Sequence, residues 1–315
     1  MDVGSSTAAT TPERPVRGAD LTLQIAGIGV RTVTPESDIL LQVRPPESWF
    51  LTPQADVRFD LQIVAGPTPD PDEGELLFRV EDVWSVSRLD GKLRVNQALG
   101  HGDYHLSRSL LLDFEAGTGT MTVAPQDNYW CFRTEPEGRV TEPFQYPILP
   151  LLIYWELANR QGLGIHASGA VIDGGACIFA GVSGAGKSTI SDLLHGAGYT
   201  ILNDDRLGLL PTGKGFQVHG TPWHGSSAFA IPQSAPLRAV FFLKQAPVNK
   251  AERMLPLQAV AELVARACPP YFSHELMSQV AATCAQIAAS VPCYRLSFLP
   301  DESVLECLRQ AIPQT

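Results

Sequence analysis

Lysine is scarce in this chain of 315 residues, with only five occurrences and no cluster of Lys or Arg anywhere. Proteins that bind nucleic acid normally present a basic face, so we expect no nucleic-acid partner. Acidic residues outnumber basic ones by 33 to 23, and the whole excess lies in residues 1–150, with 22 against 12. A solvated, solubilising surface accounts for this excess, and steering of a basic partner is the alternative.

Long apolar runs and cysteine motifs are also lacking. The longest apolar candidate, 148–155, ends at Glu156 and is far shorter than the ~18 residues that span a bilayer. Residues 1–20 have no apolar core of the kind found in signal peptides. The six cysteines form no CxxC pair and no zinc-like spacing with histidine. We therefore expect a cytoplasmic protein with reduced cysteines and no membrane partner.

The pattern of apolar and polar residues changes near residue 145. Period-2 alternation at 21–25 and 57–63 predicts half-buried antiparallel strands. Beyond it come an apolar helix at 148–160, Gly-rich turns, and amphipathic helices near 256–267 and 274–289. We expect a disordered segment at 1–20, a strand-rich accessory or substrate-recognition domain at 21–145, and an α/β domain at 146–315, consistent with two domains for this length.

The most specific motif is GVSGAGKS at 181–188, which matches the phosphate-binding pattern G-x-x-x-x-G-K-[ST] between an expected strand and helix. Glycines let backbone N–H groups surround phosphate oxygens, and a helix N-terminus adds partial positive charge. Lys187 would reach the β- and γ-phosphates of ATP, and Ser188 would bind Mg²⁺. The expected nucleotide-binding residues are Gly181, Ser183, Gly184, Ala185, Gly186, Lys187, Ser188 and Thr189.

Two adjacent carboxylates, Asp204 and Asp205, follow an expected strand at 199–203. A β-α-β crossover of this length brings the end of that strand beside the phosphate loop. Consecutive strand residues point to opposite sides, so one carboxylate can hold Mg²⁺ while the other takes the proton of an acceptor hydroxyl. We assign Asp204 as the base and Asp205 as the metal ligand with Ser188, and we leave the reverse assignment open.

A histidine is predicted at the entrance of the loop. Asp173-Gly174 is typical of a two-residue hairpin turn, and the register it implies sets His166 opposite Gly181. There His166 could contact a phosphate or polarise Asp204. The alternative is a core histidine bonded to backbone, since a slip of one residue would turn it to the other face.

His166, the 181–188 loop and the Asp204-Asp205 pair, at these spacings, resemble the catalytic core of the HPr kinase/phosphorylase-like proteins, relatives of the phosphoenolpyruvate carboxykinase fold. The resemblance is strong over 163–210 and weaker as far as 298. It implies a P-loop kinase domain in which 181–188 binds nucleotide. It also implies that His166, Asp204 and Lys187 serve phosphotransfer to a serine, while Asp205 and Ser188 hold the metal.

Several positions depart from that family. Gln217 stands where the family has an acidic residue, His219 stands where it has an arginine, and 221–227 replaces a signature stretch. The strand-rich N-terminal half does not resemble the family either, so HPr itself is a poor expected substrate. In the 221–227 stretch, Trp223 could stack on adenine or acceptor, or could cover apolar surface.

These observations predict an ATP- and Mg²⁺-dependent kinase that transfers the γ-phosphate to a hydroxyl, foremost a serine of a peptide or small protein. A kinase of a small hydroxyl metabolite, such as free serine, is one alternative. A nucleotide-sensing module without phosphotransfer is another, favoured by Gln217 and opposed by the intact aspartate pair. A homo-oligomer is left open.

Overall fold

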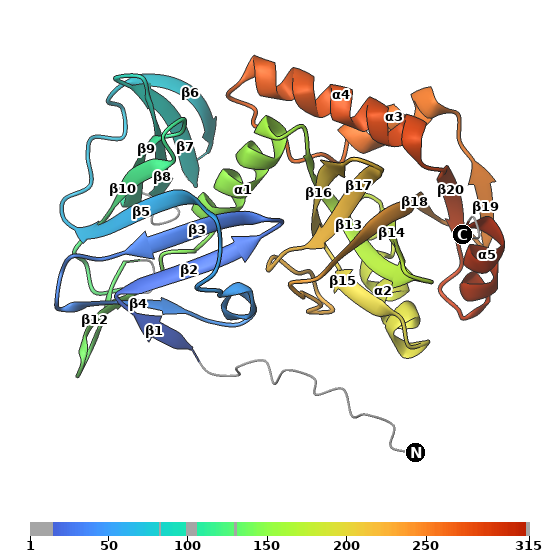
Figure 1. The fold of residues 1–315 in the computed structure, drawn as a ribbon, viewed down its shortest axis with the longest axis horizontal. Coiled ribbons are helices and arrows are strands. Elements are labelled where there is room, and N and C mark those ends of the chain that lie inside the picture. Colours follow the sequence, from blue (N-terminus) through green and yellow to red (C-terminus); the bar gives the residue numbers. More distant parts are fainter. Residues whose placement is uncertain (1–14, 82, 99–105, 129–130, 313–315) are drawn as a thin grey trace.

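The computed structural model describes residues 15–81, 83–98, 106–128 and 131–312 and has a mixed α/β architecture. Figure 1 shows the strands of the N-terminal half gathered on one side, those of the C-terminal half on the other, and helix α1 between them. The N-terminal elements are β1 (Val16–Gly18), β2 (Asp20–Ile25), β3 (Ile28–Val33), β4 (Ile39–Val43), η1 (Glu47–Phe50), β5 (Val57–Ala65), β6 (Glu75–Val80), β7 (Trp84–Leu89), β8 (Lys92–Ala98), β9 (Leu106–Asp113), β10 (Thr118–Val123), β11 (Arg133–Glu135) and β12 (Gly138–Thr141).

The elements that follow alternate between strands and helices. They are α1 (Ile148–Asn159), β13 (Leu163–Ile172), β14 (Gly175–Ala180), α2 (Lys187–Gly196), β15 (Thr200–Asn203), β16 (Arg206–Thr212), β17 (Gly215–Gly220), β18 (Ser234–Gln245), β19 (Lys250–Arg253), α3 (Pro256–Val264), α4 (His274–Ser290), β20 (Cys293–Phe298) and α5 (Ser303–Ala311). The helices expected at 148–160, 256–267 and 274–289 thus form as α1, α3 and α4.

The N-terminal half contains two sheets, one in the order β2-β3-β5-β10-β9-β8-β7-β6 and a smaller one in the order β1-β4-β12-β11. The expectation that its strands are all antiparallel is wrong, because β5 pairs parallel with both β3 and β10. Between β3 and β5 the chain forms β4 in the smaller sheet and then returns, and such a crossover is what parallel pairing requires.

The segment expected to be disordered is ordered at its end. Residues 1–14 lie outside the described residues, whereas β1 pairs antiparallel with β4. Arg17 of β1 supports this pairing, since it donates to Gln42 of β4 at 2.8 Å, and it also forms an ion pair with Glu135 of β11 at 2.6 Å.

In the C-terminal half, five strands close into a ring: β13 pairs with β14 and β16, β14 with β18, and β17 with both β16 and β18. Strand β15 adds to β13 outside this ring. The predicted hairpin forms in the predicted register, with Ile172 opposite Gly175 and Ala167 opposite Ala180. Strands β14 and β15 both run antiparallel to β13, so α2 makes the expected crossover with β13 lying between its two strands.

Helix α1 joins the two halves because it is apolar on nearly every side, as expected of a buried helix. Its residues from Ile148 to Leu157 pack in the core of the N-terminal half, and Ala158 packs in that of the C-terminal half. The exception is Glu156, whose side chain is 3% exposed and pairs with Arg58 at 3.1 Å and Arg160 at 2.6 Å.

We expect Glu156→Gln to lower the free energy of unfolding by about 3 kcal/mol, because it leaves the largely buried Arg58 guanidinium without its carboxylate. The measurement is urea unfolding. Glu252→Gln is the control, since the Lys250–Glu252 pair is more than half exposed at both side chains and such pairs contribute little. Equal effects of the two substitutions would contradict this account of α1.

Candidate active site

The glycine-rich loop connects β14 to the first turn of α2. Gly184 and Gly186 have φ of +78° and +105°, a region that favours glycine. A Cβ on Gly186 would also lie 2.7 Å from the Phe298 ring. The amide groups of the first turn of α2 have no partners within the helix, so this end of the helix is suited to an anion.

Lys187 begins α2 and is buried, with 8% of its surface exposed. Its ammonium donates to the carbonyl oxygen of Gly181 at 3.1 Å. Burial lowers the pKa of Lys187 more than the nearby carboxylates of Asp205 and Asp204 raise it. An additional anion at the loop would therefore stabilise the charged form of Lys187.

Asn203, the last residue of β15, positions both predicted aspartates. It is fully buried, and its side-chain oxygen accepts from the backbone N–H groups of Asp205 and Arg206, each at 2.6 Å. Its amide nitrogen donates to the carbonyls of Thr221 at 2.8 Å and Trp223 at 3.2 Å. One side chain thus holds the aspartate turn against residues 221–227, which we call the covering loop.

Asp204 is 1% exposed and faces the covering loop. Its two carboxylate oxygens accept from the backbone N–H groups of Gly225 and Ser227, each at 2.8 Å. A Cβ on Gly225 would lie 2.9 Å from the Asp204 carboxylate, so the loop approaches closely only because this position is glycine. Ser226, between these two donors, donates from its hydroxyl to that of Ser188 at 2.9 Å.

The carboxylate of Asp205 contacts His166, the histidine predicted near the loop. His166 Nδ1 lies 3.3 Å from one Asp205 oxygen, and Arg206 Nε lies 3.2 Å from the other. His166 and Arg206 are opposite one another on β13 and β16. Desolvation raises the pKa of Asp205, but the hydrogen bond and charge of His166 and the charges of Arg206 and Lys187 outweigh it, so the pKa lies below its usual value. Of the two contacts considered for His166, with a phosphate or with Asp204, the second is corrected, because the carboxylate that His166 contacts is that of Asp205.

Two of the residues that depart from the family pattern lie away from this cluster. Gln217 pairs with Leu210, four residues along β16 from Arg206, and donates to Ser234 Oγ at 3.0 Å. His219 is partly buried on the same strand, and burial lowers its pKa to about 4. Within the described part of the chain, the side chain of Gln217 is bonded to Ser234 and not to either aspartate, so the substitution of the family's acidic residue leaves the Asp204-Asp205 turn intact.

Trp223 packs edge-on against Tyr154 of α1, with ring centroids 5.5 Å apart. This contact favours the alternative that it covers apolar surface. The covering loop also contains His224, whose Nδ1 lies 2.8 Å from the Gly225 carbonyl oxygen.

A cavity of about 470 Å³ adjoins the glycine-rich loop on the side of α2. Gly184, Gly186 and Thr189 line one wall, and Gln245, Phe298 and Pro300 line the other. The Gln245 amide donates to the Gly184 carbonyl at 2.7 Å. Sequence reasoning missed this second wall, since β18 and β20 carry no motif.

The side chains expected to bind Mg²⁺ are few. Among the described residues, no group of three or more His, Cys, Asp and Glu could hold a metal ion. Mg²⁺ is usually bound by one or two carboxylates together with waters and substrate phosphates. The aspartate turn and Ser188, which the covering loop links, fit a metal of that kind.

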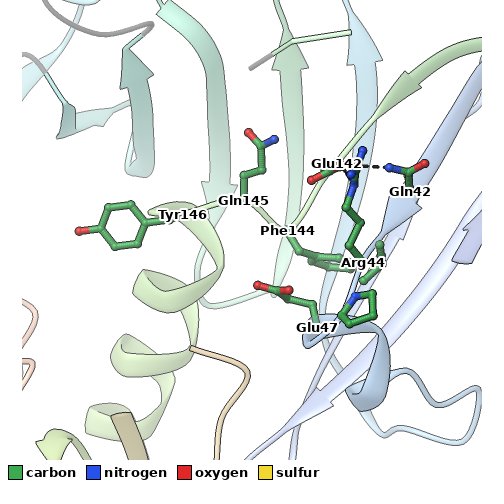
Figure 2. Close-up of a pocket in the computed structure, with 9 residues that line it drawn as sticks. Gln42, Arg44, Glu47, Glu142, Phe144, Gln145 and Tyr146 are labelled. Carbon is green, nitrogen blue, oxygen red and sulfur yellow. Dashed lines mark hydrogen bonds and ion pairs between the residues drawn. The ribbon is translucent and has the colours of Figure 1, made fainter. Parts of the chain in front are cut away.

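A second cavity, of about 320 Å³, lies between residues 42–47 and residues 142–146 of the N-terminal half (Figure 2). Glu142 there accepts from Gln42 at 3.0 Å and pairs with Arg44 at 2.6 Å. Burial raises the pKa of Glu47 to about 6, with a further rise from Glu142 and a lowering by His224 of the covering loop. This cavity therefore contains a carboxyl whose pKa burial holds above its ordinary value.

Within the described residues, no helix is both long and apolar enough to cross a membrane.

Comparison with known proteins adds the following. Residues 146–303, half of the chain, match the model of a family described as SynChlorMet cassette protein ScmC. Among solved structures, one similar to this chain is the Hpr(Ser) kinase/phosphatase from Coxiella burnetii, with 14% sequence identity and a TM-score of 0.28, covering 47% of this chain and 94% of that one. No curated protein matches the sequence significantly.

Asn203→Ala should lower the free energy of unfolding by about 3 kcal/mol, because it leaves several buried backbone groups without hydrogen-bond partners. Gln217→Ala, which removes the same amide group from a more exposed position, should change it by less than about 0.5 kcal/mol. Chemical unfolding of both variants measures the difference, and a similar small change in both would contradict the positioning role of Asn203.

The raised pKa of Glu47 predicts a pH dependence of known sign. Its contribution to stability is fully present below the unfolded value of 4.5 and is lost as pH rises through about 6. Glu47→Gln should therefore raise the free energy of unfolding at pH 7 by up to about 2 kcal/mol and have little effect at pH 4. Thermal unfolding across this range tests it, with the exposed Glu137→Gln as control. A pH-independent difference between Glu47→Gln and the unsubstituted protein would contradict it.

Proposed function

The chain belongs to the ScmC family, and we propose that it is an ATP-dependent kinase that transfers the γ-phosphate to a hydroxyl, foremost a serine of a peptide or small protein. The observation that carries this proposal is the convergence of Lys187, at the start of α2, with the pair formed by Asp205, after β15, and His166 of β13. A cation that could bind phosphate and a carboxylate that could accept a proton thus lie in one site.

The nucleotide end of the site would be formed by the loop and its cavity. The α2 amide groups and Lys187 would bind the phosphates, and the adjoining cavity beside Phe298 and Gln245 would take the nucleoside. Gly184 and Gly186 have the positive φ that favours glycine, and as glycines they carry no side chain where the phosphates would approach.

The metal end would lie between Ser188 and the aspartate turn. Mg²⁺ bound there would neutralise charge on the transferred phosphate. Asp204 is joined to Ser188 through the hydrogen bonds of Gly225, Ser226 and Ser227, which favours Asp204 as the carboxylate nearer the metal.

Asp205 is then the better candidate for the base, the reverse of our first assignment. Its carboxylate is 21% exposed and contacts His166, whereas Asp204 is buried with both oxygens hydrogen-bonded to backbone. Asp205 would accept the proton of the acceptor hydroxyl as the acceptor oxygen bonds to the γ-phosphorus. The bond from that phosphorus to the β–γ bridging oxygen breaks, and ADP leaves. His166 would orient the carboxylate.

A nucleotide-binding module that transfers no phosphate is the second candidate. The engagement of both Asp204 oxygens by the covering loop favours it, because a carboxylate held in this way acts as an anchor. A kinase of a small hydroxyl metabolite uses the same residues and differs only in the acceptor.

The test is transfer of labelled γ-phosphate from ATP and Mg²⁺ to a library of serine-containing peptides and, separately, to free serine. We expect labelled peptide. Lys187→Ala should weaken ATP binding severely, whereas Asp205→Asn should lower turnover by ~10²- to 10⁴-fold with ATP affinity nearly unchanged. Lys214→Ala, at an exposed turn, is the matched control for loss of a lysine.

Unchanged ATP affinity in Lys187→Ala would overturn the proposal, and a loss of turnover confined to Asp204→Asn would restore the first assignment. Labelling of free serine alone would favour the metabolite kinase. Tight ATP binding without transfer to any acceptor would favour the nucleotide-binding module.

A further inference from the structure

An aromatic cavity of about 170 Å³ lies where α1, the N-terminal half and residues 267–272 meet. Aromatic side chains make up about half of its lining: Phe78, Trp84, Tyr146, Tyr154, Trp155, Tyr271 and Phe272. The rings contact one another, with Phe78 stacked on Tyr271 at 5.3 Å and Trp155 edge-on to Phe272 at 4.4 Å. None of the described lining residues is acidic.

The aromatic cavity is connected to the candidate base through one residue. Arg206 lines the cavity, and its Nε lies 3.2 Å from the Asp205 carboxylate. Its side chain is about one-third exposed, so the guanidinium borders both the cavity and the site.

A second connection runs through the backbone. The segment that forms one wall of the cavity is attached to the strand that carries His166. The N–H of His166 donates to the Arg266 carbonyl at 2.8 Å, and that of Cys268 donates to the Gly164 carbonyl at 2.8 Å. The cavity wall and the histidine are thus held at a constant separation.

The size of the aromatic cavity limits what it can take. Sites for drug-sized ligands enclose ~300–1,000 Å³, so about 170 Å³ suits one side chain and excludes a nucleotide. Ring walls favour another ring in an edge-on or offset arrangement, and the Arg206 guanidinium can lie against its face. Tyr271, 55% exposed, and Tyr146, 54% exposed, leave the lining accessible from solvent.

We propose that the aromatic cavity binds an aromatic side chain of the acceptor, within a few residues of the serine whose hydroxyl contacts Asp205. This inference rests on the proposed kinase function, because it makes the cavity a specificity subsite for a peptide acceptor. An extended peptide advances ~3.5 Å per residue. A side chain near the serine can therefore occupy the cavity, which Arg206 borders, while the serine hydroxyl contacts the Asp205 carboxylate. Free serine has no aromatic side chain that could occupy the cavity.

The first experiment measures binding without phosphotransfer. A set of short peptides is made in which Ala replaces the serine that would be phosphorylated. Each peptide has a single Phe at one of the flanking positions and Gly at the others. Calorimetry measures the affinity of each peptide. At one position, Phe should bind ~10-fold or more tightly than Gly, from burial of one ring. Equal affinities at every position overturn the proposal.

Two variants locate the effect. Ala267→Leu extends a side chain into the cavity and should abolish the preference for Phe, whereas Ala265→Leu, at an exposed position of the same segment, should retain it. Tyr271→Ala removes one wall and should reduce the preference if Ala267→Leu does not fold. A preference retained in both Ala267→Leu and Tyr271→Ala overturns the assignment to this cavity.

The last measurement separates the two proposals. With the serine restored, kcat/KM for labelled phosphate transfer should follow the same Phe preference. Transfer to Phe- and Gly-containing peptides at equal rates, together with equal binding, overturns the subsite and leaves the kinase. A Phe preference in binding without transfer to either peptide overturns the kinase and the subsite's role in it.

Discussion

The pairing register of β13 is the constraint on which the candidate site depends. Three residues within a stretch of four on this strand are opposite the ends of three other strands: His166 faces Arg206 of β16, Ala167 faces Ala180 of β14, and Gly169 faces Asn203 of β15. The glycine-rich loop follows Ala180, and the aspartates follow Asn203. Because a slip of one residue would invert every side chain, this one register brings together the groups that we propose bind phosphate and accept a proton.

Desolvation acts on the charged groups that this register assembles. It lowers the pKa of Lys187 and opposes the ionisation of Asp205, so each group is stabilised by charges of the opposite sign nearby. Arg206 extends the same cluster toward α1, where Tyr154 packs against Trp223. The site is therefore formed by both the strand ends and the buried helix between the two halves.

The site could be predicted from sequence wherever a short local pattern carries the chemistry. The loop, the hairpin register and the aspartate pair all have signatures within a few residues, and the structure brings them together. Asn203 was read only as strand, although an Asn before Asp-Asp at a strand end is a signal for side-chain bonding to the following backbone N–H groups. The contact of His166 with Asp205 was not among the roles that the sequence left open for this histidine, because no local pattern specifies how the turn after β15 orients the two carboxylates. The β3–β5–β10 parallel pairing and the aromatic cavity depend on contacts between distant segments, and no local pattern encodes these.

The hydrogen bond between the hydroxyls of Ser226 and Ser188 has a consequence for how the two halves communicate. A ligand that takes the Ser188 hydroxyl exchanges it for the contact with the covering loop, and that loop also holds Asp204 and presses Trp223 onto α1. Under the proposed function, phosphate binding at Ser188 and the packing of Trp223 on α1 would therefore be linked through the covering loop. Linkage makes any coupling between them reciprocal, so a contact that stabilised this packing would change phosphate affinity by the same factor that phosphate changed the packing.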